Sequence, residues 1–409
     1  MKQAASEGTP SSISELNRSR IINFLFRNGI SSRAQIAKAT GLTAAAITKI
    51  TARLIDFGVI SETGDLEGAM NRRSIGLQFN DSRYEVIAVK FARSLVQIGI
   101  FELSGRCIKI HDFPPVNNED VIDTVSQIKQ YIKSTIAHNP AIVAVGMAVP
   151  GPYLSDEGRI ISVTSMQMWK EVNFKKEFTQ AFAVPTFIEH DAQSGALAQS
   201  LFGTQTDGNS LAYYLIGEGV GVGVIDNGNL VSGSRGVATE IGHLSIDING
   251  RPCECGNVGC LERYCSTGAV KELLQEPSNR GILEGVNDLL PREVCNRLFK
   301  ESYAGNAEAQ RIVREIARYI AYGCINIIYG YNPSQIIIGD ILSEAGDTML
   351  DEVRRIVAER VLPDLMESTT ITLSDLPTDA TLTGAAAVAA SQFLRNPSRF
   401  VAGMDTPKR

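Results

Sequence analysis

The sequence has no apolar run that approaches the roughly 20 residues of a transmembrane helix. Its first residues, MKQAASEGTPSS, contain no apolar signal core. These two absences predict a soluble, cytoplasmic chain without membrane insertion. An excess of basic charge is also absent, because the formal net charge is −6. A protein that coats nucleic acid through uniform positive charge is therefore excluded.

The sequence also lacks the even number of cysteines that is typical of a disulfide framework. The chain has 7 cysteines, and this number is typical of a reducing compartment rather than of a disulfide-bonded domain. Four of them are scattered through mostly apolar stretches and are expected to be buried thiols: Cys107, Cys265, Cys295 and Cys324. The other three lie within one short segment.

That segment gathers one imidazole and three thiols with glycines at its bends: His243, Cys253, Cys255 and Cys260. Three thiolates and one imidazole complete the tetrahedron of Zn²⁺ and leave no open position for a water molecule. The spacing therefore predicts a structural zinc site rather than a hydrolytic one. An iron–sulfur cluster is the alternative, although such clusters prefer four thiolates.

Length and charge distribution indicate several domains. A chain of 409 residues exceeds the size at which a single core is usual, so two or three domains are expected. Residues 1–80 contain ten Lys and Arg and six Asp and Glu, a net charge of +4 that leaves −10 for the rest. This asymmetry predicts a small basic module attached to an acidic body.

The basic module reads as a helix-turn-helix. After an expected flexible tail over residues 1–12, apolar spacing predicts a helix over 13–28 that ends at Gly29. Ser32 is expected to cap a short second helix over 33–40, and a third helix follows over 43–57. Two short helices joined by a turn that contains glycine are typical of DNA-binding domains.

Two strands around a basic loop, over residues 59–64 and 75–79, make the module a winged variant that we assign to residues 13–80. We expect the third helix and the wing to contact DNA through Thr43, Ala44, Thr48, Lys49, Arg53, Arg72 and Arg73. An operator with two-fold symmetry implies a homodimer or a homotetramer. A three-helix oligomerisation or docking module is the alternative interpretation.

The body alternates strands and helices from Tyr84 onward. Strands are expected over 85–90, 96–102, 142–149, 211–216, 221–225 and 335–338, with long helices over 120–137 and 312–328. We predict two α/β lobes, over 81–195 and 196–380, with a ligand cleft at their junction. An Ala-rich closing helix at about 380–396 is expected to pack against the first lobe.

The metal-binding segment carries a family resemblance. Glu240-Ile241-Gly242-His243, followed by Cys253-x-Cys255-Gly256-x-x-Gly259-Cys260-x-Glu262, resembles the signature of the ROK family, which comprises repressors, open reading frames and sugar kinases. The resemblance covers roughly residues 13–390. With the winged module in front, the whole chain resembles the sugar-responsive ROK repressors of the Mlc and NagC type. It implies an α/β fold with a two-lobed, actin-like, hexokinase-type domain behind a winged helix-turn-helix.

The resemblance also implies roles for single residues. The zinc ligand His243, Glu240 and Glu262 would contact sugar hydroxyls. Asp191 occupies the position of the base of the sugar kinases, and His190 replaces their Asn as a hydroxyl ligand. The alternatives are ordinary surface acids at 240 and 262 and a helix-capping polar pair at 190 and 191.

Phosphoryl transfer is not expected. In the kinases the first phosphate-binding turn reads D-x-G-x-T, whereas this chain has Lys90-Phe91-Ala92-Arg93-Ser94, so a cation replaces the Mg²⁺-organising Asp and side chains fill both glycine positions. The second, glycine-rich turn carries Glu218 where a small residue is expected. The resemblance therefore predicts a non-enzymatic regulator of carbohydrate uptake or metabolism, in kind a repressor, that binds double-stranded operator DNA and a sugar or sugar phosphate. The alternatives are a ROK sugar kinase with an accessory DNA-binding domain and a repressor controlled by a sugar-transport protein partner.

Overall fold

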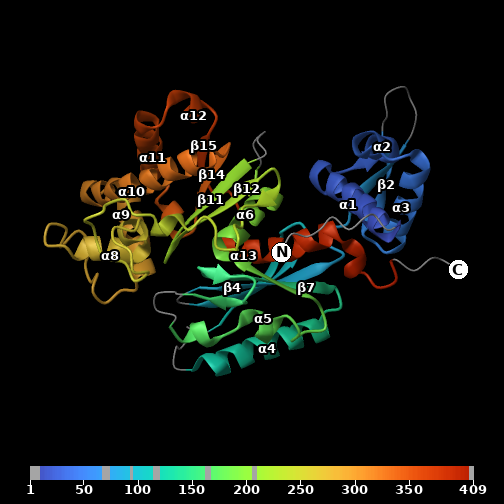
Figure 1. Ribbon diagram of the computed structural model, residues 1–409, viewed down its shortest axis with the longest axis horizontal. Helices are drawn as coiled ribbons and strands as arrows, with labels where there is room; N and C mark the ends of the chain where they lie inside the picture. Colours follow the sequence, from blue (N-terminus) through green and yellow to red (C-terminus); the bar gives the residue numbers. More distant parts are fainter. Residues whose placement is uncertain are drawn as a thin grey trace.

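The computed structural model describes residues 10–66, 74–92, 95–113, 120–161, 167–204 and 210–404. These residues form a small N-terminal domain of helices and two α/β lobes, with the C-terminal helix running from between the lobes toward the small domain (Figure 1). In this described part of the chain, no helix combines the length and the apolar character that crossing a membrane requires.

The small domain is a winged helix-turn-helix. Its elements are α1 (Pro10–Asn28), β1 (Ser31–Ser32), α2 (Arg33–Thr40), α3 (Ala44–Asp56), β2 (Ile60–Leu66) and β3 (Ser74–Phe79). The strands form an antiparallel sheet in the order β1-β3-β2. The expected helices and wing strands are confirmed. The tail expected over residues 1–12 is wrong at its end, because α1 already begins at Pro10, where proline is accepted in the first helical turn.

Local signals in the sequence explain where α2 begins and ends and where α3 begins. The Ser32 hydroxyl accepts a hydrogen bond from Gln35 N at 3.3 Å, and Gln35 Oε1 accepts one from Ser32 N at 2.8 Å, so this end of α2 is closed by a capping box. Gly41 ends α2 with φ of 70°, a conformation that glycine adopts without strain. Thr43 then caps α3 by accepting from Ala46 N at 3.3 Å.

The N-terminal lobe contains one mixed sheet in the order β10-β7-β4-β5-β6. Its strands are β4 (Glu85–Phe91), β5 (Val96–Glu102), β6 (Cys107–Asp112), β7 (Ile142–Val149) and β10 (Thr186–His190), with β8 (Tyr153–Leu154) and β9 (Arg159–Ile160) as a separate hairpin and α4 (Val121–His138) and α5 (Phe174–Phe178) as its helices. Strand β7 lies parallel to both β4 and β10. The expected strands at 85–90, 96–102 and 142–149 are confirmed.

The C-terminal lobe contains a second sheet in the order β13-β12-β11-β14-β15. Its strands are β11 (Ser210–Ile216), β12 (Val220–Asp226), β13 (Asn229–Leu230), β14 (Gln335–Gly339) and β15 (Thr370–Leu373). Its helices are α7 (Glu262–Cys265), α8 (Thr267–Gln275), α9 (Pro291–Tyr303), α10 (Ala307–Tyr331), α11 (Asp347–Arg360) and α12 (Pro363–Glu367). The apolar face of α10 supplies much of the core of this lobe.

Two helices connect the lobes. α6 (Asp191–Phe202) packs against β11 and β12, and α13 (Ala380–Arg395) packs against α6 and against β4 and β7. Their backbones approach closely, since a Cβ added at Gly384 would lie 2.4 Å from the carbonyl carbon of Ser194, and one at Gly146 would lie 1.8 Å from Ala385 O. Larger side chains on α13 would not fit between these backbones, so this packing requires the small Ala and Gly residues of the helix.

The winged domain shares its core with the N-terminal lobe. One continuous cluster of buried residues runs from Ile21 of α1 and Leu54 of α3 to Val86 of β4 and Phe393 of α13. The boundary that we predict at residue 80 therefore lies inside a packed core, and the two parts form one body rather than two domains joined by a free linker.

Candidate functional site

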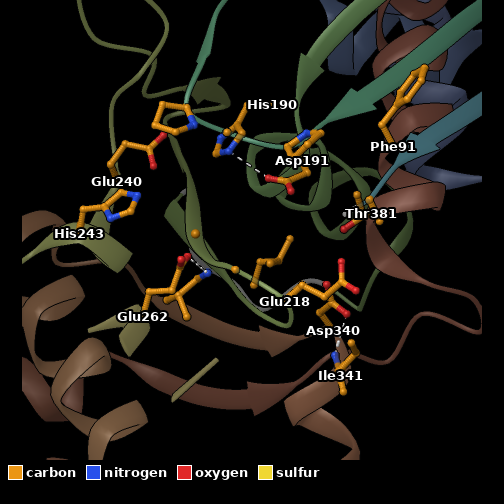
Figure 2. Close-up of a pocket in the computed structure, with 18 of the residues that line it drawn as sticks. Phe91, His190, Asp191, Glu218, Glu240, His243, Glu262, Asp340, Ile341 and Thr381 are labelled. Carbon is orange, nitrogen blue, oxygen red and sulfur yellow. Dashed lines mark hydrogen bonds and ion pairs between the residues drawn. The ribbon is translucent and has the colours of Figure 1, made fainter. Parts of the chain in front are cut away.

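A pocket with a volume of about 200 Å³ lies between the lobes. Its wall is built by the ends of β4 and β10, the turn between β11 and β12, the segment from Glu240 to Glu262, the turn after β14 and the start of α13. Figure 2 shows side chains from these elements converging on one space. Strand ends at the junction of α/β layers are a common place for ligand binding.

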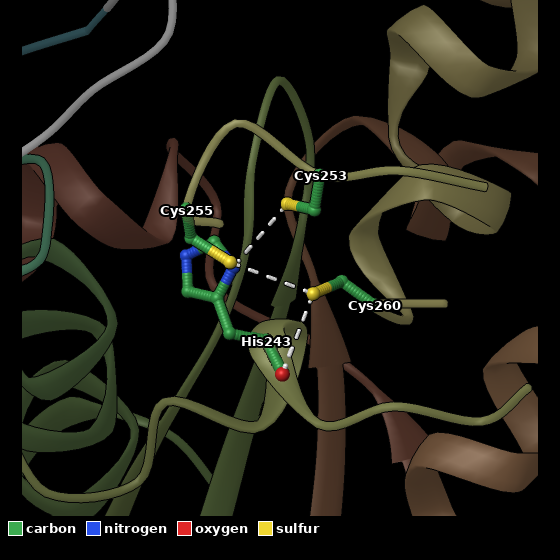
Figure 3. Close-up of side chains that lie close together, drawn as sticks. All are labelled: His243, Cys253, Cys255 and Cys260. Atoms are coloured by element: carbon green, nitrogen blue, oxygen red, sulfur yellow. Dashed lines mark hydrogen bonds between the residues drawn. The ribbon is translucent and has the colours of Figure 1, made fainter. Parts of the chain in front are cut away.

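The four predicted metal ligands come together at one side of this pocket. Ligand atoms of His243, Cys253, Cys255 and Cys260 all lie within 4.8 Å of one another (Figure 3). The Sγ atoms of Cys255 and Cys260 are 3.6 Å apart, and Cys253 Sγ lies 3.8 Å from His243 Nδ1. Ligands of a tetrahedral Zn²⁺ with bonds of about 2.3 Å stand about 3.8 Å apart. The geometry fits the ion, and the set holds three thiols and one imidazole as a closed site requires.

The metal-binding loop is folded by its own backbone. Cys253 N donates to Asn257 O at 2.9 Å, and Asn257 Nδ2 donates to His243 O at 3.1 Å. Gly259 has φ of 73°, and a Cβ there would lie 1.8 Å from Asp247 O, so only glycine fits. Burial raises the pKa of the Cys260 thiol to about 12, so a thiolate at this position needs a cation beside it.

Two carboxylates flank the loop and face the pocket, as Figure 2 shows. Glu240 directly precedes the short helix η3 (Ile241–His243), which ends at the candidate metal ligand His243. Its Oε1 atom is buried and has no hydrogen-bond partner among the residues that the structure describes, and burial raises the pKa of this carboxyl. Glu262 Oε2 accepts from Val220 N at 2.9 Å. Glu240 is thus a buried acceptor that a donor on a ligand can satisfy.

His190 and Asp191 meet at the junction of β10 and α6. His190 Nε2 lies 3.0 Å from Asp191 Oδ1, and His190 is only 4% exposed. Burial alone would lower the pKa of this imidazole, but the carboxylates of Asp191, Glu240 and Glu189 outweigh burial and raise it to about 9. The ring is therefore an imidazolium at neutral pH, and it forms an ion pair with the carboxylate of Asp191. Asp191 is the first residue of α6, and its Oδ1 accepts from Ala192 N at 2.6 Å.

A partly buried ion pair lies at the pocket and connects β4 to the start of α13. Lys90 Nζ lies 2.6 Å from Asp379 Oδ2, and Lys90 is 6% exposed. Burial would lower the pKa of the Lys90 ammonium, but Asp379 and Asp340 reverse the effect and raise it. The pKa of Asp379 is lowered, because Lys90 and the amides of Leu382 and Thr381 outweigh its burial. Lys90 is thus a fixed cation bound to its own chain.

Asp340 was not among the residues expected to form the site. It follows β14 with φ of 66°, a strained conformation for a non-glycine residue that marks functional positions more often than others. Burial raises the pKa of its carboxyl, with partial compensation by Lys90. Its sequence signal is its place directly after the buried strand β14. For Asp379 and Thr381 the signal is their place at the start of the buried helix α13.

The expected DNA contacts differ in their surroundings. Thr43, Ala44, Thr48 and Lys49 are exposed on α3. Arg53 is instead directed at the C-terminal segment: its Nη2 donates to Gly403 O at 2.6 Å, its Nε donates to Met404 O at 3.2 Å, and its guanidinium lies over the Phe57 ring. In this arrangement Arg53 connects the winged domain to the C-terminal segment, and its contact with DNA stays a prediction. Arg72 and Arg73 lie outside the described residues.

Comparison with known proteins agrees with this architecture. The profile of the ROK family matches residues 86–392, and that of a winged helix-turn-helix DNA-binding domain matches residues 15–61. The chain is 26% identical over 385 residues to the xylose repressor of Bacillus spizizenii, covering 93% of this chain and 97% of that protein. It is 26% identical over 371 residues to the DNA-binding transcriptional dual regulator NagC of Escherichia coli, covering 89% and 90%.

Solved structures show the same fold. A ROK family transcriptional regulator described as a homolog of the E. coli Mlc protein superimposes with a TM-score of 0.78 at 24% identity, over 96% of this chain and 100% of that one. A ROK family glucokinase from Streptomyces griseus in complex with glucose and AMPPNP gives a TM-score of 0.63 at 23% identity, over 74% and 98%. The kinase lacks a counterpart to about a quarter of this chain, whereas the regulator matches the winged domain as well. Since the family profile spans most of the sequence, the chain belongs to the ROK family.

Proposed function

We propose that this chain is a transcriptional repressor of genes for carbohydrate uptake or metabolism, and that a sugar or sugar derivative bound between the lobes controls it. The observation that carries the proposal is the shared core: a DNA-binding domain is packed onto the same body that forms the sugar-kinase-like pocket. The relatives support the class of function, because those named above are a xylose repressor and a transcriptional regulator.

Within the pocket, we assign sugar binding to Glu240, Glu262, His243, Asp191 and His190. The buried, unpaired Oε1 of Glu240 is the main support, because vicinal hydroxyls donate well to a carboxylate. His243, Cys253, Cys255 and Cys260 would hold a structural Zn²⁺ that fixes the loop between Glu240 and Glu262. The zinc has no role in a reaction.

The alternative of a sugar kinase is disfavoured by the same residues. A kinase needs a carboxylate that is able to accept a hydroxyl proton, whereas Asp191 is paired with the imidazolium of His190. It also needs a Mg²⁺-organising acid after the first strand, where Lys90 is bound to Asp379. We therefore propose that the chain has no phosphoryl-transfer activity.

A route from the pocket to DNA is provided by α13. At its start Thr381 lines the pocket, and Asp379 is paired with the pocket residue Lys90. Near its end, Ser19 Oγ and Asn23 Nδ2 of α1 donate to Leu394 O at 2.9 and 3.1 Å. A ligand that prefers one arrangement of the lobes would move the winged domain together with the N-terminal lobe. In a homodimer or homotetramer this motion changes the spacing of two recognition helices on an operator.

The proposal is tested by selecting DNA sites from a random pool with the full-length chain and then measuring release of the selected site by sugars. We expect a two-fold symmetric site and release by at least one sugar in the absence of any other protein. Release only after a sugar-transport protein is added would instead support control by a protein partner. Phosphorylation of a sugar from ATP at an enzymatic rate would refute the repressor assignment.

Replacing Lys49 with Ala should weaken DNA binding across all sequences. Lys49 is exposed on α3, and a lysine that neutralises one phosphate releases about one counterion. Log affinity decreases linearly with log salt concentration, and we expect the magnitude of this slope to be smaller by about 1 in the variant. Fluorescence anisotropy measures both values. The matched control is Lys109→Ala on β6, remote from α3, which should leave both affinity and slope unchanged. An unchanged slope for Lys49→Ala would remove this residue from the interface.

Replacing Glu240 with Gln should remove the response to sugar while sparing DNA binding. The amide keeps the volume of the carboxyl but exchanges one acceptor oxygen for a donor, so a pair of sugar hydroxyls loses a partner. A hydrogen bond to a charged group contributes about 1.5–3 kcal/mol, so we expect at least tenfold weaker sugar binding by calorimetry. Equal affinity of the variant and the parent would place the sugar elsewhere.

The stabilising effect of His190 should depend on pH. Its folded-state pKa is raised from 6.5 to about 9, so its contribution to stability is fully present below pH 6.5 and is lost as the pH rises through 9. The variant His190→Asn should therefore be most destabilised relative to the parent at pH 6, and the difference should shrink by pH 9. Urea unfolding at several pH values measures this. A difference that stays constant with pH would mean that His190 is neutral in the folded chain.

A further inference from the structure

We propose that the pocket accepts only unphosphorylated sugars and rejects sugar phosphates and nucleotides. This inference rests on the proposed function, because it defines the chemistry of the effector at the same site. It follows from the hydrogen bonds of backbone N–H groups at the pocket. Proteins ordinarily use such N–H groups to bind phosphate, and here they donate to carboxylates of the chain.

Phosphate groups are usually held by backbone N–H groups at helix starts and in glycine-rich turns. Two such positions in the pocket wall are occupied by carboxylates of the chain. At the start of α6, Ala192 N donates to Asp191 Oδ1 at 2.6 Å. In the glycine-rich turn before β12, Val220 N donates to Glu262 Oε2 at 2.9 Å, a contact visible in Figure 2. Neither N–H remains available for a ligand oxygen.

The other two positions are occupied in the same way. In the turn after β14, Ile341 N donates to Asp340 Oδ1 at 2.7 Å. At the start of α13, both Thr381 N and Leu382 N donate to Asp379 Oδ1 at 2.9 Å. At these four positions in and beside the pocket wall, a carboxylate oxygen of the chain therefore occupies N–H groups that a phosphate oxygen would otherwise use.

The remaining charges strengthen the exclusion. Six carboxylates line the pocket: Asp191, Glu218, Glu240, Glu254, Glu262 and Asp340. The cations that line it are His190, Lys90 and Arg292, of which the first two are held by Asp191 and Asp379 and the third is an exposed side chain. A phosphate dianion would meet these six carboxylates at close range with only the exposed Arg292 as a pocket cation outside these ion pairs, and in a partly buried site such repulsion is weakly screened.

A neutral sugar avoids these costs. Its hydroxyls donate to the unpaired Oε1 of Glu240 and need no free backbone N–H. The pocket therefore distinguishes a sugar from its phosphate ester by charge, at the end formed by Glu218 and Asp340, which lie beside each other in Figure 2.

Calorimetry on the full-length, zinc-loaded chain tests the inference with three matched pairs: D-xylose and xylose 5-phosphate, D-glucose and glucose 6-phosphate, and N-acetylglucosamine and its 6-phosphate, with Mg-ATP as a further probe. We expect at least one neutral sugar to bind, its ester to bind at least tenfold more weakly, and Mg-ATP not to bind. An ester that binds as tightly as its parent sugar would overturn the inference.

Variants identify the cause of the exclusion. The double substitution Glu218→Gln and Asp340→Asn removes two charges, and Asn keeps the acceptor for Ile341 N and tolerates the positive φ. We expect the affinity for the ester to rise at least tenfold and that for the neutral sugar to change less than threefold. Glu284→Gln, which removes the charge of an exposed carboxylate that does not line the pocket, is the control and should leave the preference unchanged. No gain for the ester in a double variant that melts like the parent would refute the role of these charges.

The two proposals fail in different ways. If operator DNA is bound and only phosphate esters release it, the repressor stands and the neutral-sugar inference falls. If neutral sugars bind but no DNA site is selected, the repressor falls and the preference of the pocket remains. If no sugar binds in either form, the inference is wrong, and DNA binding alone decides the repressor assignment.

Discussion

Replacing Cys255 with Ser is expected to abolish stoichiometric zinc binding and, with it, the response to sugar. Cys255 Sγ lies 3.6 Å from Cys260 Sγ, the spacing of two thiolates on one tetrahedral ion. Structural zinc sites of this type bind with about 10–16 kcal/mol, and a hydroxyl in place of one thiolate removes a large part of that energy. Metal analysis should show a fall from one zinc per chain to well below one.

Loss of zinc from the loop should also weaken sugar binding in the pocket. Cys255 is exposed, so its replacement by Ser creates no cavity, and any drop in melting temperature reports the metal rather than packing. Glu240 and Glu262 stand at the two ends of the loop, so sugar affinity should fall at least tenfold while DNA binding by the winged domain persists. Cys107→Ser, which changes a thiol on β6 outside the cluster, is the control and should retain zinc. A zinc-free variant with unchanged melting and unchanged sugar release would refute the structural role of the site.

Much of the fold follows from patterns that are local in the sequence. The strand Ile142–Val149 has the limits that its apolar run predicts, because a strand buried on both faces is apolar along its length. The strand Val96–Glu102 also has its predicted limits. The turn between α2 and α3 was equally readable, since Ser32 and Gly41 are residues whose backbone roles are specific. The cluster of one His and three Cys could be predicted because its four members lie within eighteen residues.

What could not be predicted depends on contacts between distant segments. Lys90 and Asp379 are 289 residues apart in the chain, and no local pattern pairs them. Arg53 has the position of a DNA contact on a recognition helix, yet its guanidinium binds carbonyl groups 350 residues later. The shared core of the winged domain and the N-terminal lobe is likewise a tertiary feature, which makes the predicted boundary at residue 80 a boundary of sequence pattern rather than of packing.

Replacing Lys90 with Met is expected to destabilise the chain by about 3–5 kcal/mol at pH 7, the usual cost of leaving a buried charge unpaired. Met preserves the length and volume of the side chain, so packing contributes little. Without the ammonium, the partly buried carboxyls of Asp379 and Asp340 lose their shared counter-charge, and the folded-state pKa of each rises. The measurement is the free energy of unfolding in urea for the variant and the parent.

The sign of the pH effect distinguishes this cause from a packing defect. In the parent the pKa of Asp379 is lowered by Lys90, so this carboxylate stabilises the fold above its unfolded-state pKa and loses that effect as the pH falls. In the variant both carboxyls have raised pKa values, so their penalty is present at neutral pH and is relieved as acid protonates them. The difference between variant and parent should therefore be smaller at pH 5 than at pH 7, whereas a packing defect would not change with pH.

The double variant Lys90→Met with Asp379→Asn completes the cycle. The Asn side chain still accepts from the N–H groups of Thr381 and Leu382, so the cap of α13 is kept while the unpaired charge is removed. We expect the double variant to recover at least half of the stability lost in Lys90→Met, because replacing both partners of a buried pair costs far less than removing one. Additive losses would mean that the two side chains do not interact, and α13 would then be connected to β4 through apolar packing alone.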